Sequence, residues 1–222
     1  MTTSSSKRGH LIVFEGLDRS GKSTQCERLV EYLQSQGQKV EHARFPNRST
    51  VIGQMINNYL TGTSQQEDHA IHLLFSANRW EAAEKIKSSI ESGTTVVIDR
   101  YYYSGCVYSA AKRNPTMDLA WCRHMEVGLP RPDLCLFLDI TAEKAAIRRG
   151  FGTERYEKQE MQDRVRELFA EMRTHPDEEE DIVVIDAGGT VEQVEAAIQT
   201  TVKRRLGEVE AESRPLRFIQ PW

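Results

Sequence analysis

Short apolar runs alternate with longer helix-forming stretches along this chain. Each run is rich in Val, Ile, Leu or Phe and lacks the regular alternation with polar residues that marks a half-buried strand. Such runs are typical of strands that are buried on both faces of a parallel sheet. We therefore expect strands at Leu11–Phe14, Lys39–Phe45, Thr94–Ile98, Leu134–Ile140 and Ile182–Ile185.

The stretches between these runs favour helices, and the clearest are Ser23–Gln36, Asp68–Ser92 and Met161–Arg173. Strands that alternate with helices are joined by right-handed crossovers, which place helices on both faces of the sheet. No linker rich in Pro, Gly or Ser divides the chain. The pattern predicts one α/β domain, a three-layer sandwich with about five parallel strands.

The composition argues against several classes of protein. The 222 residues carry a net charge of −4, whereas domains built to bind nucleic acid usually show a basic balance. The longest apolar stretches, such as Leu134–Leu138, are far shorter than the ~18 residues of a membrane span. We expect neither a nucleic acid polymer nor a membrane among the partners.

The cysteines show neither C-x-x-C spacing nor a histidine pair at zinc-ligand spacing. We expect reduced, mostly structural thiols in an intracellular protein of the cytoplasm, the nucleus or both. Residues 1–8 lack an apolar segment and are expected to form a flexible leader, with a very short organellar presequence as the alternative. The cysteines are Cys26, Cys106, Cys122 and Cys135.

Three later segments differ from the repeating pattern. Residues 148–156 are basic and carry two glycines between helical stretches. Residues 176–181 are acidic, and we expect them to form a solvated loop. The tail, residues 206–222, ends in an apolar stretch that we expect to dock on the surface, at a place that the sequence does not specify.

A complete phosphate-binding motif follows the first apolar run. Residues 16–23 read Gly-Leu-Asp-Arg-Ser-Gly-Lys-Ser and match G-x-x-x-x-G-K-[ST] between a predicted strand and a predicted helix. Backbone N–H groups of such a loop point into one concavity, and the helix N-terminus adds partial positive charge. Lys22 reaches the terminal phosphates, and the Ser23 hydroxyl suits Mg²⁺, which prefers oxygen ligands. The motif predicts that the chain binds a nucleoside triphosphate.

Charged residues inside and around this loop suggest a second phosphate. Arg19 is placed to stabilise charge on a transferred phosphoryl group, unless it only pairs with Asp18 on a solvated loop. Arg48 and Arg100 follow predicted strands, and ligands of open α/β sheets bind at the carboxyl ends of strands. Asp99 ends an apolar run, the usual place for a carboxylate that holds Mg²⁺ through water or orients an arginine.

Phe75 and Arg79 are four residues apart and therefore share one face of a predicted helix. An aromatic ring and a donor on one face can stack on a base and read its edge. On the pattern alone, however, Phe75 fits a core position at least as well.

A resemblance extends these inferences. The segments Glu15–Thr24, Arg44–Thr50, His72–Glu81, Asp99–Tyr101 and Phe151–Glu157 occur in this order. Together they resemble the thymidylate kinase (dTMP kinase) family of P-loop nucleoside monophosphate kinases, of the eukaryotic type, over about residues 9–205. The resemblance implies a P-loop NTPase-type fold with a lid at about residues 148–162, ATP and Mg²⁺ as cofactors, a homodimer, and transfer of phosphate from ATP to dTMP.

The resemblance and the motif assign roles residue by residue. Catalysis falls to Asp18, Arg19, Lys22 and Arg100. ATP is held by Gly16, Arg19, Ser20, Gly21, Lys22, Ser23, Thr24 and Arg148, and the metal by Ser23 and Asp99. The dTMP site comprises Asp18, Phe45, Arg48, Leu60, Phe75, Arg79, Arg100, Tyr101, Gly105, Tyr108, Tyr156 and Gln162.

Within the implied dTMP site, Phe75 stacks on thymine and Arg79 bonds the edge of the base. Arg48 and Arg100 hold the monophosphate. The carboxylate of Asp18 reaches the 3′-hydroxyl, and Tyr101 crowds the 2′ position of the sugar.

Two other functions remain open from the residues themselves. A different deoxynucleotide or deoxynucleoside kinase is the nearest alternative. A nucleoside acceptor, however, would need a carboxylate base for its hydroxyl, whereas the second arginine pair suits an acceptor that carries a phosphate. A regulatory P-loop switch is the alternative of another class. Residues 186–189 match D-x-x-G, but no N-K-x-D guanine-binding sequence occurs, so we interpret the match as chance.

Overall fold

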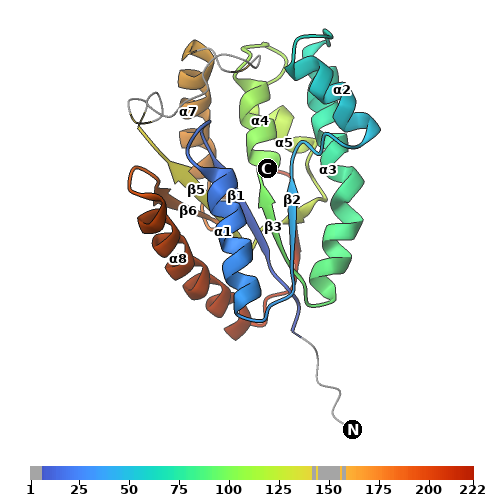
Figure 1. Cartoon of the computed structure of the whole chain (residues 1–222). Helices are drawn as coiled ribbons and strands as arrows, with labels where there is room; N and C mark the ends of the chain where they lie inside the picture. Colours follow the sequence, from blue (N-terminus) through green and yellow to red (C-terminus); the bar gives the residue numbers. More distant parts are fainter. Residues whose placement is uncertain (1–6, 142–143, 145–155, 157–158) are drawn as a thin grey trace.

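A five-stranded parallel sheet forms the centre of the computed structural model, which describes residues 7–141, 144, 156 and 159–222 (Figure 1). Its strand order is β2-β3-β1-β5-β6. Each strand overlaps an apolar run identified in the sequence, so the predicted α/β fold is confirmed. The strands are β1 (Leu11–Gly16), β2 (Val40–Arg44), β3 (Thr95–Asp99), β5 (Leu134–Asp139) and β6 (Ile182–Asp186).

Helices cover both faces of this sheet and make the three layers predicted from the sequence (Figure 1). One apolar cluster joins α1 and α8 to the sheet, and a second joins α3, α4, α5 and α7 to the opposite face. The helices are α1 (Lys22–Ser35), α2 (Val51–Leu60), α3 (Asp68–Glu91), α4 (Tyr102–Ala110), α5 (Leu119–His124), α7 (Gln159–Arg173) and α8 (Val191–Ala211).

Local capping signals explain where several helices begin. Thr50 precedes α2, and its hydroxyl accepts a hydrogen bond from the Gly53 N–H. Thr190 and Gln193 form a reciprocal capping box at the start of α8. These caps satisfy N–H groups that the first turn of a helix leaves without partners.

The expectation that all five strands are buried on both faces is wrong for the two edge strands. β1 and β3 are buried along their whole length, and β5 is buried except at its last residue. β2 and β6 are partly exposed, because each has one neighbouring strand and lies at the margin of the helical layers. The polar Glu41 and His42 in β2 fit this edge position.

The acidic segment at residues 176–181 is not simply solvated, because Glu178 and Asp181 are fully buried. Glu178 accepts hydrogen bonds from the Arg123 guanidinium at 2.7 Å and the Tyr102 hydroxyl at 2.5 Å. Asp181 pairs with Arg131 and Arg217. The sequence pattern suggests a solvated run because these cationic partners lie far from it along the chain.

The C-terminal tail is part of the packed structure. α8 continues past residue 205 to Ala211, and a short strand β7 (Arg217–Phe218) then pairs antiparallel with β4 (Pro130–Arg131). Ile219 is fully buried, and the Trp222 ring stacks on His175 with centroids 4.0 Å apart. The tail therefore closes the core on the side of α4 and α5.

Two further observations bear on the composition. All four cysteines are buried and free of disulfides. Among the described residues, no helix has the length and apolar character needed to cross a membrane.

Candidate active site

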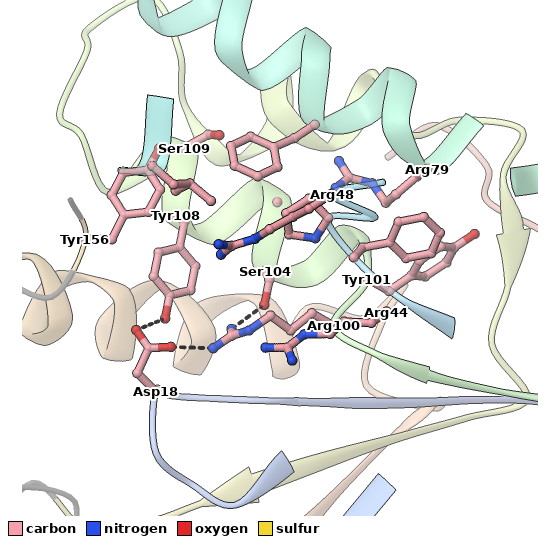
Figure 2. A pocket seen from close by; sticks show the side chains of 15 residues that line it. Asp18, Arg44, Arg48, Arg79, Arg100, Tyr101, Ser104, Tyr108, Ser109 and Tyr156 are labelled. Carbon is pink, nitrogen blue, oxygen red and sulfur yellow. Dashed lines mark hydrogen bonds and ion pairs between the residues drawn. The ribbon is translucent and has the colours of Figure 1, made fainter. Parts of the chain in front are cut away.

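A cavity of about 320 Å³ opens at the carboxyl ends of β1, β2 and β3. It collects side chains from the loop after β1, the end of β2 and the β2–α2 connection, α2, α3, the turn after β3 and the length of α4 (Figure 2). The residues expected to form the dTMP site line it, except Gln162. The lining residues are Asp18, Arg44, Phe45, Pro46, Arg48, Leu60, Phe75, Arg79, Arg100, Tyr101, Ser104, Gly105, Tyr108, Ser109 and Tyr156.

The predicted phosphate-binding loop lies beside this cavity and joins β1 to α1. Three of its residues have positive φ: Gly16 (135°), Arg19 (66°) and Gly21 (93°). A Cβ on Gly16 would lie 2.4 Å from the Leu138 carbonyl oxygen, so only glycine fits there. This backbone course bends the loop over the N-terminus of α1, the arrangement that binds phosphate in P-loop proteins.

Lys22 is buried inside the loop. Its Nζ donates hydrogen bonds to the carbonyl oxygens of Gly16 (3.0 Å) and Leu17 (2.5 Å) and lies 3.4 Å from the Ser20 hydroxyl. Burial and the nearby Arg100 guanidinium lower the pKa of Lys22 to about 7. The lysine is therefore poised to gain charge when a polyanion enters the loop.

Ser23 and Asp99 form an oxygen pair suited to a hard cation. The Ser23 hydroxyl donates to Asp99 Oδ2 at 2.6 Å, which brings the end of β3 against the start of α1. Asp99 Oδ1 is buried and accepts no hydrogen bond from the residues described. A buried carboxylate oxygen beside a hydroxyl fits Mg²⁺, which usually takes one or two protein ligands and completes its shell with phosphate and water.

Asp18 connects the loop to the cavity. Its carboxylate pairs with the Arg100 guanidinium and accepts from the Tyr108 hydroxyl at 3.0 Å (Figure 2). It also accepts from the Gln162 amide at 2.9 Å. Burial opposes ionisation, but Arg100, Lys22 and these hydrogen bonds hold the pKa of Asp18 below its usual value. Asp18 thus stays ionised and fixes the Arg100 side chain.

One end of the cavity is strongly cationic. Arg44, Arg48 and Arg100 all reach it (Figure 2). Arg48 donates to Asn57 Oδ1 at 2.9 Å, and Arg100 donates to the Ser104 hydroxyl at 3.1 Å. This end can bind an anionic group such as a phosphate.

The other end of the cavity has the features of a site for a planar ring. Phe75 is half-buried and lines the cavity, so it is more than a core residue, although it also packs against the apolar cluster around α2. Arg79 is nearly fully buried and forms a bidentate ion pair with Glu126. A Cβ on Gly105 would lie 2.6 Å from the Arg79 guanidinium, so glycine leaves room for this arginine.

Tyr101 forms part of the cavity wall (Figure 2). Its hydroxyl donates to the Pro130 carbonyl at 3.2 Å, and its ring lies 5.8 Å from the Phe45 ring, centroid to centroid. With the hydroxyl engaged, the ring is held against the cavity wall.

The expected lid contributes further predicted site residues. Arg148 and residues 149–155 of the expected lid lie outside the described residues. Of that segment, Tyr156 lines the cavity and Gln162 bonds Asp18.

The sequence analysis missed several residues that shape the site. Glu126 pairs with Arg79. Ser104 accepts a hydrogen bond from Arg100 and donates one to Glu15. Arg44 and Ser109 line the cavity. Glu15 and Arg44 lie inside segments that carry the family resemblance, but Glu126 falls in a turn with no sequence signal.

Comparison with known proteins shows a consistent likeness. A family model described as "Thymidylate kinase" matches residues 14–198. Thymidylate kinase of Arabidopsis thaliana is 46% identical over 212 residues, which cover 96% of this chain and 77% of the relative. Thymidylate kinase of Homo sapiens is 44% identical over 211 residues, which cover 91% of this chain and 98% of the relative. A solved structure of thymidylate kinase from Candida albicans matches with a TM-score of 0.83 at 36% identity and covers 96% of this chain and 99% of its own.

The lowered pKa of Lys22 makes a prediction about proton uptake. At pH 8 a lysine with a pKa of about 7 is mostly neutral, and a bound triphosphate raises that pKa because it favours the charged form. ATP binding at pH 8 should therefore take up approximately one proton. Calorimetric titrations in buffers of different ionisation enthalpy measure this uptake. Lys22→Arg, which stays protonated, should abolish it; equal binding enthalpies in all buffers would contradict the prediction.

Proposed function

This chain belongs to the thymidylate kinase family of nucleoside monophosphate kinases, and we propose that it transfers the γ-phosphoryl group of ATP to dTMP. The products are ADP and dTDP, an intermediate of dTTP synthesis. The observation that carries the proposal is the junction at Asp18 and Arg100. There a phosphate-binding loop for the donor meets a cavity with a cationic end and an aromatic end.

The two ends of the cavity match the two parts of dTMP. We assign the monophosphate to Arg48 and Arg100, and the thymine ring to Phe75 and Arg79. Glu126 fixes the Arg79 guanidinium and so leaves it as a rigid donor toward the edge of the base. We assign Tyr101 to the 2′ side of the sugar, where its ring, held in the cavity wall by the hydroxyl bond to Pro130, would meet a 2′-hydroxyl.

The reaction requires charge stabilisation more than proton transfer. The attacking oxygen of dTMP is already ionised near neutral pH, so the main task is to align two anionic phosphate groups. Lys22 and Arg19 are assigned to the donor and Arg100 to the acceptor. Ser23 and Asp99 would hold Mg²⁺, which supplies Lewis-acid stabilisation of the phosphate charge when bound.

The cation-rich acceptor end favours a nucleotide over a nucleoside acceptor. A deoxynucleoside kinase needs a base for the sugar hydroxyl, whereas the carboxylate nearest the cavity, Asp18, is committed to Arg100. Another deoxynucleoside monophosphate kinase is the nearest alternative. An ADP-release assay with dTMP, dUMP, dCMP, dGMP and dAMP tests the proposal. We expect the highest kcat/KM with dTMP, and no turnover of dTMP would overturn it.

We further propose a homodimer, in keeping with the family resemblance. Leu73 and Trp80 lie seven residues apart on one face of α3 and are 46% and 44% exposed, so this face offers apolar surface that a second copy can cover. Sedimentation velocity should show a dimer, and a monomer at micromolar concentration would exclude it. The free, buried cysteines support an intracellular location, in the cytoplasm or nucleus.

Base stacking predicts the effect of Phe75→Leu. Stacking on an aromatic side chain is worth about 1–3 kcal/mol, so the KM for dTMP should rise about tenfold or more while that for ATP stays nearly constant. Steady-state kinetics with each substrate varied measures the split. Phe75→Tyr, which keeps the ring, is the control. Equal losses for both substrates together with a lower melting temperature would show that Phe75 serves only the core.

Arg19 is predicted to act mainly in the transition state. The backbone at residue 19 has φ of 66°, so Arg19→Gly removes the guanidinium and keeps the loop conformation. Loss of one preorganised donor lowers kcat by on the order of 10²–10³, with KM little changed. Arg149→Ala is the comparison for the lid arginines. If Arg19→Gly kept a near-normal kcat and Arg149→Ala lost it, the arginine that stabilises the transferred phosphoryl group would belong to the lid.

A further inference from the structure

Glu15 is a second carboxylate at the phosphate-binding loop, and the proposed reaction gives it no role. It is the residue before Gly16 and is fully buried. Its carboxylate forms hydrogen bonds with residues at the start of α4 and does not line the cavity. Oε1 accepts hydrogen bonds from the N–H groups of Tyr101 (2.8 Å) and Ser104 (3.0 Å).

These two N–H groups are the pair that a capping box satisfies at the start of a helix. Tyr101 is the N-cap residue of α4 and makes no side-chain cap of its own. Ser104 is the third residue of the helix. Glu15 therefore supplies from β1 the cap that α4 lacks in its own sequence. Its negative charge also lies at the end of the helix where the dipole favours an anion.

The other carboxylate oxygen of Glu15 reaches Arg100 through one hydroxyl. Ser104 Oγ donates to Glu15 Oε2 at 2.6 Å. Because a serine hydroxyl has a single proton, Ser104 then turns its lone pairs toward Arg100, whose Nη1 donates to it at 3.1 Å (Figure 2). The chain of donors runs from Arg100 to Ser104 to Glu15.

Two residues of β1 also hold the backbone around Arg100. Arg100 has φ of 67°, in the left-handed region that a residue with a Cβ rarely adopts. Its N–H donates to the Phe14 carbonyl at 3.0 Å, and the next N–H, of Tyr101, donates to Glu15. Consecutive residues of β1 thus fix the unusual turn from which the Arg100 side chain projects.

We propose that Glu15 is a positioning residue, which acts through Ser104 and the start of α4 to hold the Arg100 guanidinium where the acceptor phosphate binds. The inference rests on the proposed function, because it takes Arg100 to hold the phosphate of dTMP. Asp18 fixes one side of the guanidinium, and the Glu15–Ser104 pair fixes the other.

Two substitutions separate positioning from support of the fold. Glu15→Gln keeps an amide oxygen to cap α4, but its nitrogen can only donate to Ser104, so the Ser104 hydroxyl proton loses its carboxylate acceptor and the chain from Arg100 to residue 15 is broken. Ser104→Ala leaves the Glu15 cap on the backbone and removes only the link to Arg100. Ser89→Ala is the matched control, a buried serine whose hydroxyl donates to Glu41 at 3.1 Å, away from the cavity.

We expect Glu15→Gln and Ser104→Ala each to raise the KM for dTMP about tenfold or more, the usual cost of losing a hydrogen bond to a charged group. The KM for ATP and the melting temperature should change little, and Ser89→Ala should match the unaltered enzyme. The double variant should be no worse than the more impaired single variant, because both act on one path to Arg100.

Unchanged KM values for dTMP in both single variants would overturn the proposal. Equal rises of both KM values with a lower melting temperature would also overturn it, since Glu15 would then be a structural cap alone. No phosphorylation of dTMP by the unaltered enzyme would instead refute the proposed function, and the positioning role would fall with it.

Discussion

The ion pair between Asp18 and Arg100 joins the two halves of the candidate active site. Asp18 belongs to the loop after β1 and Arg100 to the turn after β3, and these strands are neighbours in the sheet. Parallel strands end at one edge, so the pairing of β1 with β3 brings a phosphate-binding loop against a cationic cavity. A kinase needs this juxtaposition, because donor and acceptor phosphates must meet in line.

The concentration of positive charge at this junction has a cost that the fold offsets locally. Lys22, Arg100 and the cavity arginines repel one another, and the lowered pKa of Lys22 reflects both burial and Arg100. Asp18, Asp99 and Glu15 supply the opposing charge and favour the charged form of Lys22. The carboxylates thereby keep cations in place at positions where the proposed substrates would bring the remaining negative charge.

Buried ion pairs recur away from the phosphates and hold secondary elements to one another. Arg79 and Glu126 connect α3 to the turn after α5, and Arg123 and Glu178 connect α5 to the segment before β6. The indole N–H of Trp222 also donates to Glu178, at 3.1 Å, which ties the C-terminus to the same network. Breaking one partner of such a pair leaves an uncompensated buried charge, so these contacts specify how the helices pack.

The sequence by itself determined the strands, the phosphate-binding loop and its place between β1 and α1. These features depend on local signals: runs of buried apolar residues, and glycines at fixed spacing before a helix. It also marked Arg48, Arg79 and Arg100 as candidates, and the family resemblance gave them roles.

The partners of those residues came only from the tertiary structure. Glu15 caps a helix that begins 87 residues later, at Tyr102, Glu126 holds Arg79 across 47 residues, and Glu178 is buried against Arg123 across 55 residues. Such pairs form because the fold encloses charges that must find a counter-charge, and no local pattern records which distant residue will provide it.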